Sequence, residues 1–359
     1  MSRHYEIPTH LLLWIVILLT TTTFGTAAAR AGGSNSDPHA NITSQSSHAR
    51  VNPAIWTKAD FLSAIPYPRP EVEFDEWSTV APDEIDFADG PAGLIPSKTG
   101  VGEPTLEKIS SRRATIPKKA PYSYPAPFTR MEVFDSYKAF PYRTIGKLFF
   151  RRDGSNFVCS AASIGGYGIW TAGHCVHKGN GRQDGWSEDV VFVPAYKNGN
   201  APYGQWTASW LITKTAWYED ENLAYDMGGA ILFSKNGRKI SERVGALGFA
   251  WNQGASQHWN AFGYPAGSPF NGKKLYVCQA SYAYRSSKPG PDPVGIGCDM
   301  TGGSSGGPWI LEFTGTGTKG NYLNGNVSYG RVGFPDEAFS PYFNSSAKSM
   351  RDEIISGIP

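Results

Sequence analysis

The chain has 359 residues and a formal net charge of +2, so its charge gives no reason to expect nucleic acid as a partner. Hydrophobic residues make up 40% of the sequence, which also holds 41 glycines and 26 prolines, and this composition favours a loop-rich β protein over a helical bundle. A chain of this length can form one large domain or two modest ones.

Residues 1–29 have the layout of a secretory signal peptide. Arg3 and His4 precede an apolar run over residues 11–19, and Ala27-Ala28-Ala29 provides a small-residue cleavage site. The run is shorter than the about 20 apolar residues that span a bilayer, and an uncleaved signal anchor that continues through the threonines is the alternative. We expect a secreted, extracellular protein without stable membrane association. Its four cysteines suit disulfide formation in an oxidising compartment.

Residues 30–127 differ in composition from the rest of the chain. Half of the 26 prolines lie here, acidic stretches such as residues 71–76 interrupt the segment, and sustained periodicity is lacking. This pattern predicts a largely irregular propeptide ahead of a domain that covers residues 128–359. Arg112-Arg113 and Lys118-Lys119 are candidate processing sites at its end, although basic pairs also occur by chance in solvated linkers.

The remainder of the chain carries short apolar runs at the spacing of β-hairpins. A first set covers residues 142–150, 157–164, 168–172, 190–193, 206–212 and 227–233. A second set starts near Val244 and includes residues 258–263, 274–281, 308–313 and 322–329. No helix is expected among these strands, whereas residues 345–355 have apolar positions at helical spacing after Asn344-Ser345 as a cap. The pattern predicts an all-β protein that ends in one helix.

Ser305 lies among four glycines, directly after Ser304, in the stretch Gly302-Gly303-Ser304-Ser305-Gly306-Gly307-Pro308. Glycines allow backbone turns with positive φ and close approach to a ligand, and the N–H groups between them can converge on one point. Such convergence is how an oxyanion hole is built. Because a serine hydroxyl is a weak nucleophile until a base takes its proton, Ser305 requires a histidine elsewhere in the chain.

That histidine is supplied by Thr171-Ala172-Gly173-His174-Cys175. A base of this kind needs a carboxylate to orient it, and Asp226, just ahead of the apolar run Gly228-Gly229-Ala230-Ile231-Leu232, is the best candidate. The predicted catalytic residues therefore follow the chain order His174, Asp226, Ser305.

At these residues the sequence resembles the chymotrypsin-like serine peptidases, and more closely their secreted microbial branch that includes the glutamyl endopeptidases. Thr-Ala-Gly-His-Cys around His174 and Gly-x-Ser-Gly-Gly-Pro around Ser305 carry the resemblance, which covers about residues 140–355. It implies two six-stranded antiparallel β-barrels with the active site between them, plus a C-terminal helix.

The resemblance also assigns roles to other residues. The N–H groups of Gly303 and Ser305 would bind the oxyanion, and Ser328, Tyr329 and Gly330 would pair with an extended substrate peptide. It implies a disulfide between Cys159 and Cys175, and the remaining Cys278 and Cys298 are then expected to form the second. We expect a monomer that acts on protein or peptide substrates without a cofactor or metal.

Three other interpretations fit parts of the sequence. An esterase elbow also fits Gly-x-Ser-x-Gly around Ser305, but its histidine follows the serine, and here the last histidine is His258. A zinc site at His174 and His177 lacks a second ligand cluster at suitable spacing. An inactive homologue that only binds protein would be expected to lose one of the three catalytic residues, and all three are present.

The sequence departs from the trypsin pattern at residues that concern activation and substrate preference. Ser304 stands where trypsin-like zymogens have the aspartate that pairs with a new N-terminus, so this chain lacks that activation switch.

Asp299 lies where trypsin-like enzymes bind Arg or Lys, and it could equally be a loop residue that hydrogen-bonds nearby backbone. Val327 and Met300 replace the polar residues that bind the substrate carboxylate in glutamyl endopeptidases, so a glutamyl endopeptidase with an altered pocket is the alternative.

Overall fold

The computed structural model describes residues 41–46, 56–73, 88–100, 126–286, 290–317 and 319–358, which all belong to one compact unit of the chain. The expected signal peptide and the basic pairs at residues 112–113 and 118–119 lie outside these ranges. Within these ranges, no helix combines the length and the apolar composition that a membrane span requires.

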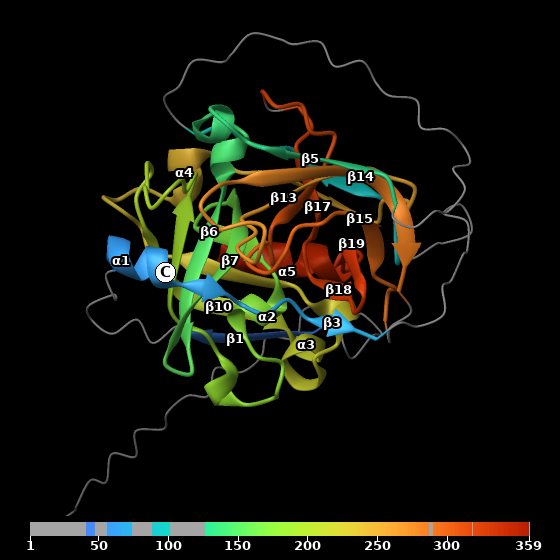
Figure 1. Cartoon of the computed structure of the whole chain (residues 1–359), viewed down its shortest axis with the longest axis horizontal. Helices are drawn as coiled ribbons and strands as arrows, with labels where there is room; N and C mark the ends of the chain where they lie inside the picture. The colour runs from blue at the N-terminus through green and yellow to red at the C-terminus, as the bar shows by residue number, and fades with distance from the viewer. Residues whose placement is uncertain are drawn as a thin grey trace, which may run out of the picture. The chain divides into compact units, whose positions relative to one another are not determined.

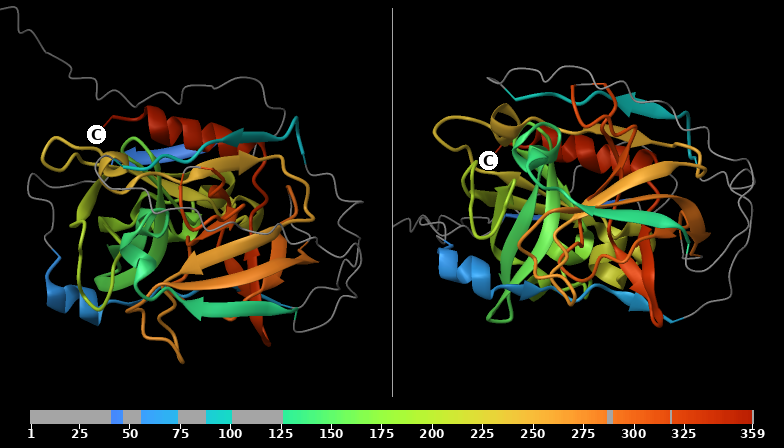
Figure 2. Two further views of the ribbon diagram at one scale, coloured as in Figure 1. Left: turned by 90° about the horizontal axis from the view of Figure 1, so that it is seen from above. Right: turned by 45° about the horizontal axis from the view of Figure 1, so that its top comes forward.

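The described chain is mostly β (Figures 1 and 2). Its strands are β1 (Ile42–Ser46), β2 (Ile65–Pro66), β3 (Glu71–Val72), β4 (Gly93–Ile95), β5 (Phe128–Glu132), β6 (Ile145–Arg152), β7 (Ser155–Gly165), β8 (Gly168–Thr171), β9 (Glu188–Pro194), β10 (Trp206–Lys214), β11 (Gly228–Leu232), β12 (Gly248–Trp251), β13 (His258–Gly263), β14 (Tyr276–Arg285), β15 (Val294–Gly297), β16 (Pro308–Leu311), β17 (Tyr322–Asn326), β18 (Tyr329–Arg331) and β19 (Phe334–Ser340). The helices are α1 (Lys58–Ser63), α2 (Gly173–Val176), α3 (Thr215–Asp220), α4 (Ile240–Val244) and α5 (Ser345–Ser356).

The first set of strands closes into an antiparallel barrel in the order β10-β11-β8-β7-β6-β9, with β9 pairing back to β10. Successive side chains of β6 point to opposite faces of the sheet, and each face packs against a different hydrophobic cluster. Leu148 and Phe150 lie in the core inside the barrel, whereas Ile145 and Phe149 join the cluster that includes residues of both strand sets. β6 is therefore buried on both of its faces.

The second set of strands follows the path β18-β19-β15-β14-β13-β16-β17-β12. Among the described residues no backbone pairing between strands closes this path, so the expected second closed barrel is not seen as a continuous ladder. Where β17 and β19 come together, Asn326 N–H donates to the Ser340 hydroxyl at 2.9 Å and Ser328 N–H donates to Phe339 O at 2.9 Å. A side-chain bond and a single backbone bond thus stand in place of strand pairing.

The C-terminal helix α5 is present as predicted. The Asn344 side chain accepts hydrogen bonds from the N–H groups of Ser346 and Ala347 at 3.0 and 3.4 Å, which satisfies two groups that the helix cannot pair internally. Met350 and Ile354 are fully buried, and α5 contacts β8 and β11 of the barrel as well as β12. The helix therefore holds the two strand sets together.

Short helices among the strands were not predicted from the sequence. α3 and α4 have six and five residues, and α4 ends at Val244, where the second strand set was expected to begin. Helices of one or two turns give too little periodicity to recognise. The strands β15 and β19 were also missed.

The upstream segment, expected to be largely irregular, contributes short strands to both sheets. β1 pairs with β10, β2 with β7, β3 with β18 and β4 with β12. Strands as short as β2 and β3 are not stable alone, so tertiary pairing rather than sequence periodicity forms them.

Candidate active site

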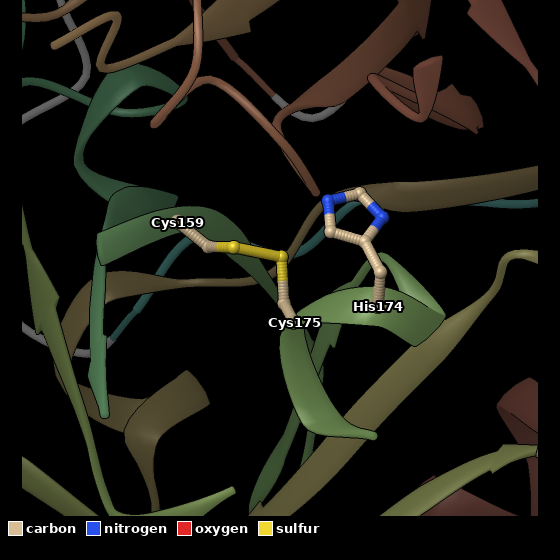
Figure 3. A group of neighbouring side chains, drawn as sticks. All are labelled: Cys159, His174 and Cys175. Atoms are coloured by element: carbon tan, nitrogen blue, oxygen red, sulfur yellow. A yellow bond between two sulfur atoms is a disulfide. The ribbon is translucent and has the colours of Figure 1, made fainter. Parts of the chain in front are cut away.

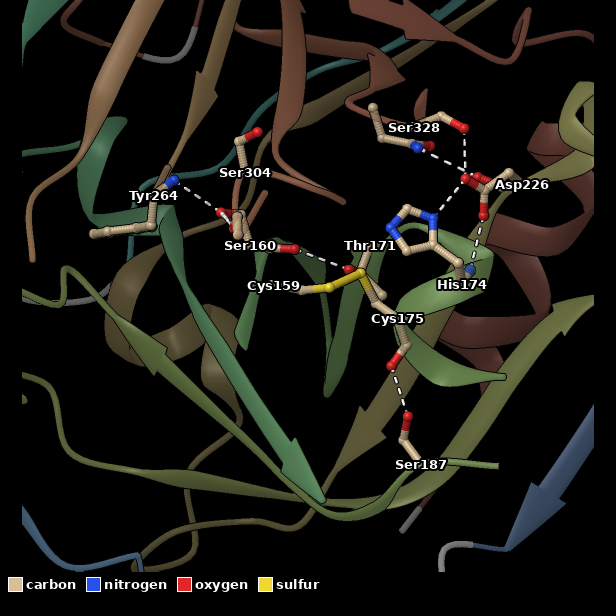
Figure 4. The surroundings of a disulfide bond; sticks show 12 residues. Cys159, Ser160, Thr171, His174, Cys175, Ser187, Asp226, Tyr264, Ser304 and Ser328 are labelled. Atoms are coloured by element: carbon tan, nitrogen blue, oxygen red, sulfur yellow. Dashed lines mark hydrogen bonds and ion pairs between the residues drawn. A yellow bond between two sulfur atoms is a disulfide. The ribbon is translucent and has the colours of Figure 1, made fainter. Parts of the chain in front are cut away.

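The pairing of β8 with β11 brings His174 and Asp226 together. Thr171 at the end of β8 faces Gly228 at the start of β11, so the residues just beyond these two positions meet at the same edge of the barrel. His174 Nδ1 lies 2.7 Å from Asp226 Oδ2, and the backbone N–H of His174 donates to Asp226 Oδ1 at 2.8 Å (Figure 4). Both side chains are buried, and the two contacts fix the position and the plane of the imidazole ring.

Asp226 also receives hydrogen bonds from the second strand set. The Ser328 hydroxyl donates to Asp226 Oδ2 (Figure 4), and the Asn326 side-chain amide donates to Asp226 O at 3.3 Å. A buried carboxylate is tolerated when donors satisfy its oxygen atoms. Ser328, predicted to pair with substrate, thus uses its hydroxyl to hold the carboxylate.

The loop that carries Ser305 is anchored on β7 through Ser160. Ser160 N–H donates to Ser305 O at 2.7 Å, its hydroxyl donates to Gly303 O at 2.9 Å, and the same hydroxyl accepts from Tyr264 N–H at 2.9 Å. Gly306 adopts φ +77°, and a methyl group built there would lie 2.0 Å from Thr171 Oγ1. Only glycine fits such a position, so the predicted Gly-rich loop is required by contact with the barrel.

Several polar groups around Ser305 have no partner among the described residues. These are the buried His174 Nε2 and Ser305 Oγ atoms, and the N–H groups of Gly303 and Ser305, for which no acceptor occurs in the described part of the chain. Buried polar groups are normally paired, and unpaired ones often mark a functional site. His174 Nε2 and Ser305 Oγ are thus not hydrogen-bonded to each other, and all four groups are available to a bound ligand.

Two disulfides flank these residues. Cys159 of β7 is bonded to Cys175 of α2, beside His174 (Figure 3), and Cys278 of β14 is bonded to Cys298. The ligand atoms of Cys159, His174 and Cys175 lie within 4.8 Å of one another, a spacing that would suit a metal. Because the two sulfur atoms are bonded to each other, neither is a thiolate that could bind one.

His177, the second histidine of the zinc interpretation, is held by backbone groups on both ring nitrogens. Its Nε2 lies 2.8 Å from Arg182 O, and its Nδ1 accepts from Gly179 N–H at 2.9 Å. This pattern fixes the neutral tautomer with the proton on Nε2. Burial lowers the pKa of His177, which agrees with a structural role.

The predicted specificity residue Asp299 lines a cavity of about 680 Å³ together with Met300, Thr301 and Gly302. Its carboxylate is paired with the Arg130 guanidinium from β5. Burial raises the pKa of the Asp299 carboxyl, against the opposing effect of Arg130. Asp299 is therefore neither a simple loop residue nor a free counter-charge.

Arg331 of β18 is not among the residues that line this cavity, and its charge is compensated. Its guanidinium makes two hydrogen bonds of 2.6 Å to the carboxylate of the fully buried Glu337. Met300 and Val327 are fully buried in the apolar core of the second strand set. The side chains that would bind a glutamate are thus absent from these two positions.

Tyr329 and Gly330, the other predicted substrate-binding residues, lie on β18. Tyr329 stacks on Phe339 with ring centroids 4.9 Å apart, and Gly330 N–H donates to Pro70 O at 3.0 Å. Sequence reasoning missed the segment to which Pro70 belongs. The signal that could have found it is the alternation Pro66-Tyr67-Pro68-Arg69-Pro70, because proline fixes φ and biases the preceding residue toward extended backbone.

Comparison with known proteins shows which solved structures have a similar fold. No protein-family model and no curated protein matches the chain. Among solved structures, the thermostable serine protease AL20 from an extremophilic microorganism is 37% identical, with a TM-score of 0.54 over 60% of this chain and 98% of that one. The protease Anisep from Arthrobacter nicotinovorans is 36% identical, with a TM-score of 0.53 over 60% of this chain and 96% of that one.

The fold and these relatives define the class as serine proteases with the chymotrypsin-like fold, and the chain belongs to this family. It is a serine-type endopeptidase, a hydrolase whose substrates are peptides or proteins.

Proposed function

We propose that the chain is a secreted serine endopeptidase in which Ser305 is the nucleophile, His174 the base and Asp226 the group that orients it. The observation that carries this proposal is the buried contact of 2.7 Å between His174 Nδ1 and Asp226 Oδ2. With Nδ1 occupied, Nε2 is the nitrogen left to take a proton, and it has no partner among the described residues. Secretion is supported by the signal-like residues 1–29 and by the two disulfides.

The chemistry follows from these positions. Ser305 Oγ attacks the substrate carbonyl carbon while its proton passes to His174 Nε2, and the N–H groups of Gly303 and Ser305 stabilise the oxyanion. His174 then gives the proton to the leaving amine, which departs as the C–N bond breaks. Water, deprotonated by His174, hydrolyses the acyl-enzyme by the same route in reverse. The charge of Asp226 stabilises the imidazolium that forms in each half-reaction.

We further propose that residues 1–29 are removed as a signal peptide and residues 30–127 as a propeptide, leaving residues 128–359 as the active enzyme. Support comes from the change of composition near residue 127 and from the residues of the proposed site, which all lie after residue 128. Intact-mass measurement of secreted protein tests this proposal. An active form that still begins near Arg30 would contradict it.

A preference for Arg or Lys at the cleaved position is part of the proposal. The Arg69 side chain reaches the cavity lined by Asp299, and its Nη1 donates to Met300 O at 3.1 Å and to Glu337 O at 3.3 Å. These oxygen atoms, with the Asp299 carboxylate nearby, form a site that suits a cation. Desolvating such acceptors without a cationic partner is unfavourable, so the pocket discriminates against apolar side chains.

Ser305→Ala tests the catalytic assignment. The variant should keep its fold, lose labelling by a fluorophosphonate reagent and lose peptide hydrolysis by about 10⁶-fold, as in a comparable triad. The controls are circular dichroism and thermal unfolding of both proteins. Processed wild-type enzyme that is folded but neither reacts with the reagent nor hydrolyses any peptide would instead be a homologue that only binds protein.

A mixed-sequence peptide library tests the preference. We expect Asp299→Asn to lower the ratio of cleavage after Arg or Lys to cleavage after apolar residues, and Arg130→Ala to raise it, because Arg130 competes for the same carboxylate. An unchanged ratio in both variants would remove Asp299 from the pocket. Cleavage mainly after glutamate would identify a glutamyl endopeptidase with a different pocket.

A further inference from the structure

Residues 65–72, which we call the crossing segment, pass over the site from one strand set to the other. β2 pairs in parallel with β7, opposite Phe157 and Val158, and β3 pairs in parallel with β18, opposite Gly330 and Arg331. Figure 1 shows this segment in blue, running from α1 to β3 beside β18. It lies on the strand that is proposed to pair with substrate.

Proline makes the crossing segment rigid and extended. Pro66, Pro68 and Pro70 fix φ and lack an N–H group, so few N–H groups remain to bond the enzyme, and Tyr67 N–H donates to Val158 O at 3.1 Å. Gly330 N–H donates to Pro70 O and Val332 N–H to Val72 O, both at 3.0 Å. Because little backbone freedom remains to be lost, such a strand binds at low entropic cost.

Tyr67 covers the catalytic histidine. Its ring stacks on the His174 ring at a centroid distance of 6.0 Å and an interplanar angle of 20°, and the Arg152 guanidinium lies 4.6 Å from the Tyr67 ring. A methyl group built on Gly302 would lie 3.2 Å from Tyr67 O, so the segment rests directly beside the proposed oxyanion donor Gly303. A substrate carbonyl cannot reach the same place while Tyr67 is there.

Arg69 occupies the specificity cavity. Besides its two carbonyl acceptors, the guanidinium rests on β18, since a methyl group built on Gly330 would lie 2.4 Å from Arg69 Nη2. Burial lowers the pKa of Arg69, while the carboxylates of Glu71 and Glu337 oppose this effect. Arg69 thus fills the place that the proposed function gives to the cationic side chain of a substrate.

The direction of the crossing segment is opposite to that of a substrate. In a productive complex, the residue in the pocket presents its own carbonyl, on its C-terminal side, to Ser305. From Arg69 the chain instead reaches the His174 side through Tyr67, on its N-terminal side, and continues C-terminally through Pro70 along β18. The carbonyl group of Arg69 therefore leads away from the nucleophile.

We propose that the crossing segment is an intramolecular inhibitor that binds the substrate cleft in reverse, with Arg69 in the specificity pocket and Tyr67 over His174, and that the enzyme cannot cleave it there. This inference rests on the proposed function of the same site. It assigns the upstream part of the chain a blocking role that needs no new N-terminus, in agreement with Ser304, whose hydroxyl donates to Thr301 O at 2.7 Å.

The first test measures how fast a fluorophosphonate reagent labels Ser305 in the intact full-length chain. We expect slow labelling of the wild type and of Lys58→Ala, an exposed cation in the same region. Arg69→Ala should label faster by about ten- to hundredfold, the effect of losing hydrogen bonds to a charged group. Arg69→Lys, which keeps the cation, should restore slow labelling in part, and thermal unfolding verifies that each variant is folded.

The outcomes separate the two proposals. Fast labelling of the wild-type chain, or a folded Arg69→Ala variant that labels no faster than the wild type, overturns the inhibitory role and leaves the proposed enzyme standing. If no full-length variant labels and none hydrolyses peptides, the proposed function fails and the inference with it. Adding Ser305→Ala to Arg69→Ala must abolish labelling, which assigns the signal to Ser305.

The second test addresses the chain direction of the crossing segment in the cleft. Proline after Arg69 would itself resist cleavage of the bond between residues 69 and 70, so Pro70→Ala removes that protection while keeping the carbonyl that Gly330 binds. With the segment in reverse, the full-length Pro70→Ala chain stays intact at this bond, as judged by mass spectrometry. Cleavage between residues 69 and 70 would show that the segment binds as a substrate and would overturn the reversed orientation.

Discussion

At the scale of single residues, Ser160 determines how the nucleophile loop sits on the barrel. Its three hydrogen bonds reach Gly303, Ser305 and Tyr264, and two of these residues supply the proposed oxyanion donors. A hydroxyl in this position holds the peptide plane of Gly303 from the carbonyl side. That plane joins Gly303 to Ser304 and lies between the two peptide planes that carry the proposed donor N–H groups, so Ser160 is a positioning residue for the proposed site.

We expect Ser160→Ala to lower kcat by about tenfold with little change in KM, because a loosened oxyanion donor weakens mainly the transition state. It leaves Tyr264 N–H buried without an acceptor, which costs about 1–3 kcal/mol of stability. Ser163→Ala is a matched control, since Ser163 lies on the same strand and its hydroxyl donates to Gly245 O at 2.8 Å, away from the loop. Steady-state kinetics measures kcat and KM of both variants, and thermal unfolding measures their stability. An equal loss of kcat in both variants would refute the positioning role.

Much of the proposed site could be inferred from the sequence at this scale because its chemistry demands particular residues. A serine nucleophile needs a base, and the base needs a carboxylate, so His174 and Asp226 follow from Ser305 without a structure. The pairing of Asp299 with Arg130 was not predictable. The two residues are 169 positions apart, and only the pairing of β5 with β14 brings Arg130 opposite Cys278, whose disulfide partner precedes Asp299.

At the scale of elements, the sequence signal was strongest where an apolar run coincides with a whole strand, as in β7 and β13. β15 and β19 were missed for different physical reasons. β15 has four residues with two glycines, and β19 begins with Phe334, Pro335 and Asp336, none of which is buried, before its buried half starts at Glu337. Pairing between the two strands compensates for these weak local preferences.

The cap of α5 gives a prediction for this scale. Asn344→Ala should lower the free energy of unfolding by about 1 kcal/mol, because two helix N–H groups lose their acceptor. Ser349→Ala, a change at an exposed position inside the same helix, should shift it by only a few tenths of a kcal/mol. Urea unfolding measures both values. A cap variant as stable as the control would mean that packing of Met350 and Ile354 alone fixes the helix.

At the scale of the whole molecule, one buried cation couples stability to pH. Lys147 of β6 is 3% exposed, donates to Gly272 O at 2.9 Å and lies 5.1 and 5.0 Å from the rings of Phe149 and Tyr196. Burial lowers the pKa of Lys147 from 10.5 to about 7. Between these two values the unfolded chain holds a proton that the folded chain has lost.

The contribution of Lys147 to the free energy of unfolding should therefore rise as pH increases from about 7 toward 10.5 and be constant below that window. Lys147→Met removes a charge that is costly to bury, so we expect it to stabilise the protein at neutral pH and to flatten the pH dependence. Lys138→Met changes an exposed lysine and is the control. Urea unfolding at pH 7, 8 and 9 tests this, and parallel pH profiles for wild type and Lys147→Met would contradict it.

The crossing segment has one more effect, which depends on its covalent attachment to the enzyme. A strand tethered beside its own binding cleft has an effective concentration of about millimolar, whatever the concentration of the protein. Once released, the same strand is diluted to the concentration of the enzyme itself. With a Kd of about micromolar, the ratio of bound to unbound attached strand would be about a thousand to one. The released strand would dissociate almost completely when the enzyme is at nanomolar concentration. Dilution after release would thus make activation one-way in practice, even though the inhibitory strand binds only moderately well.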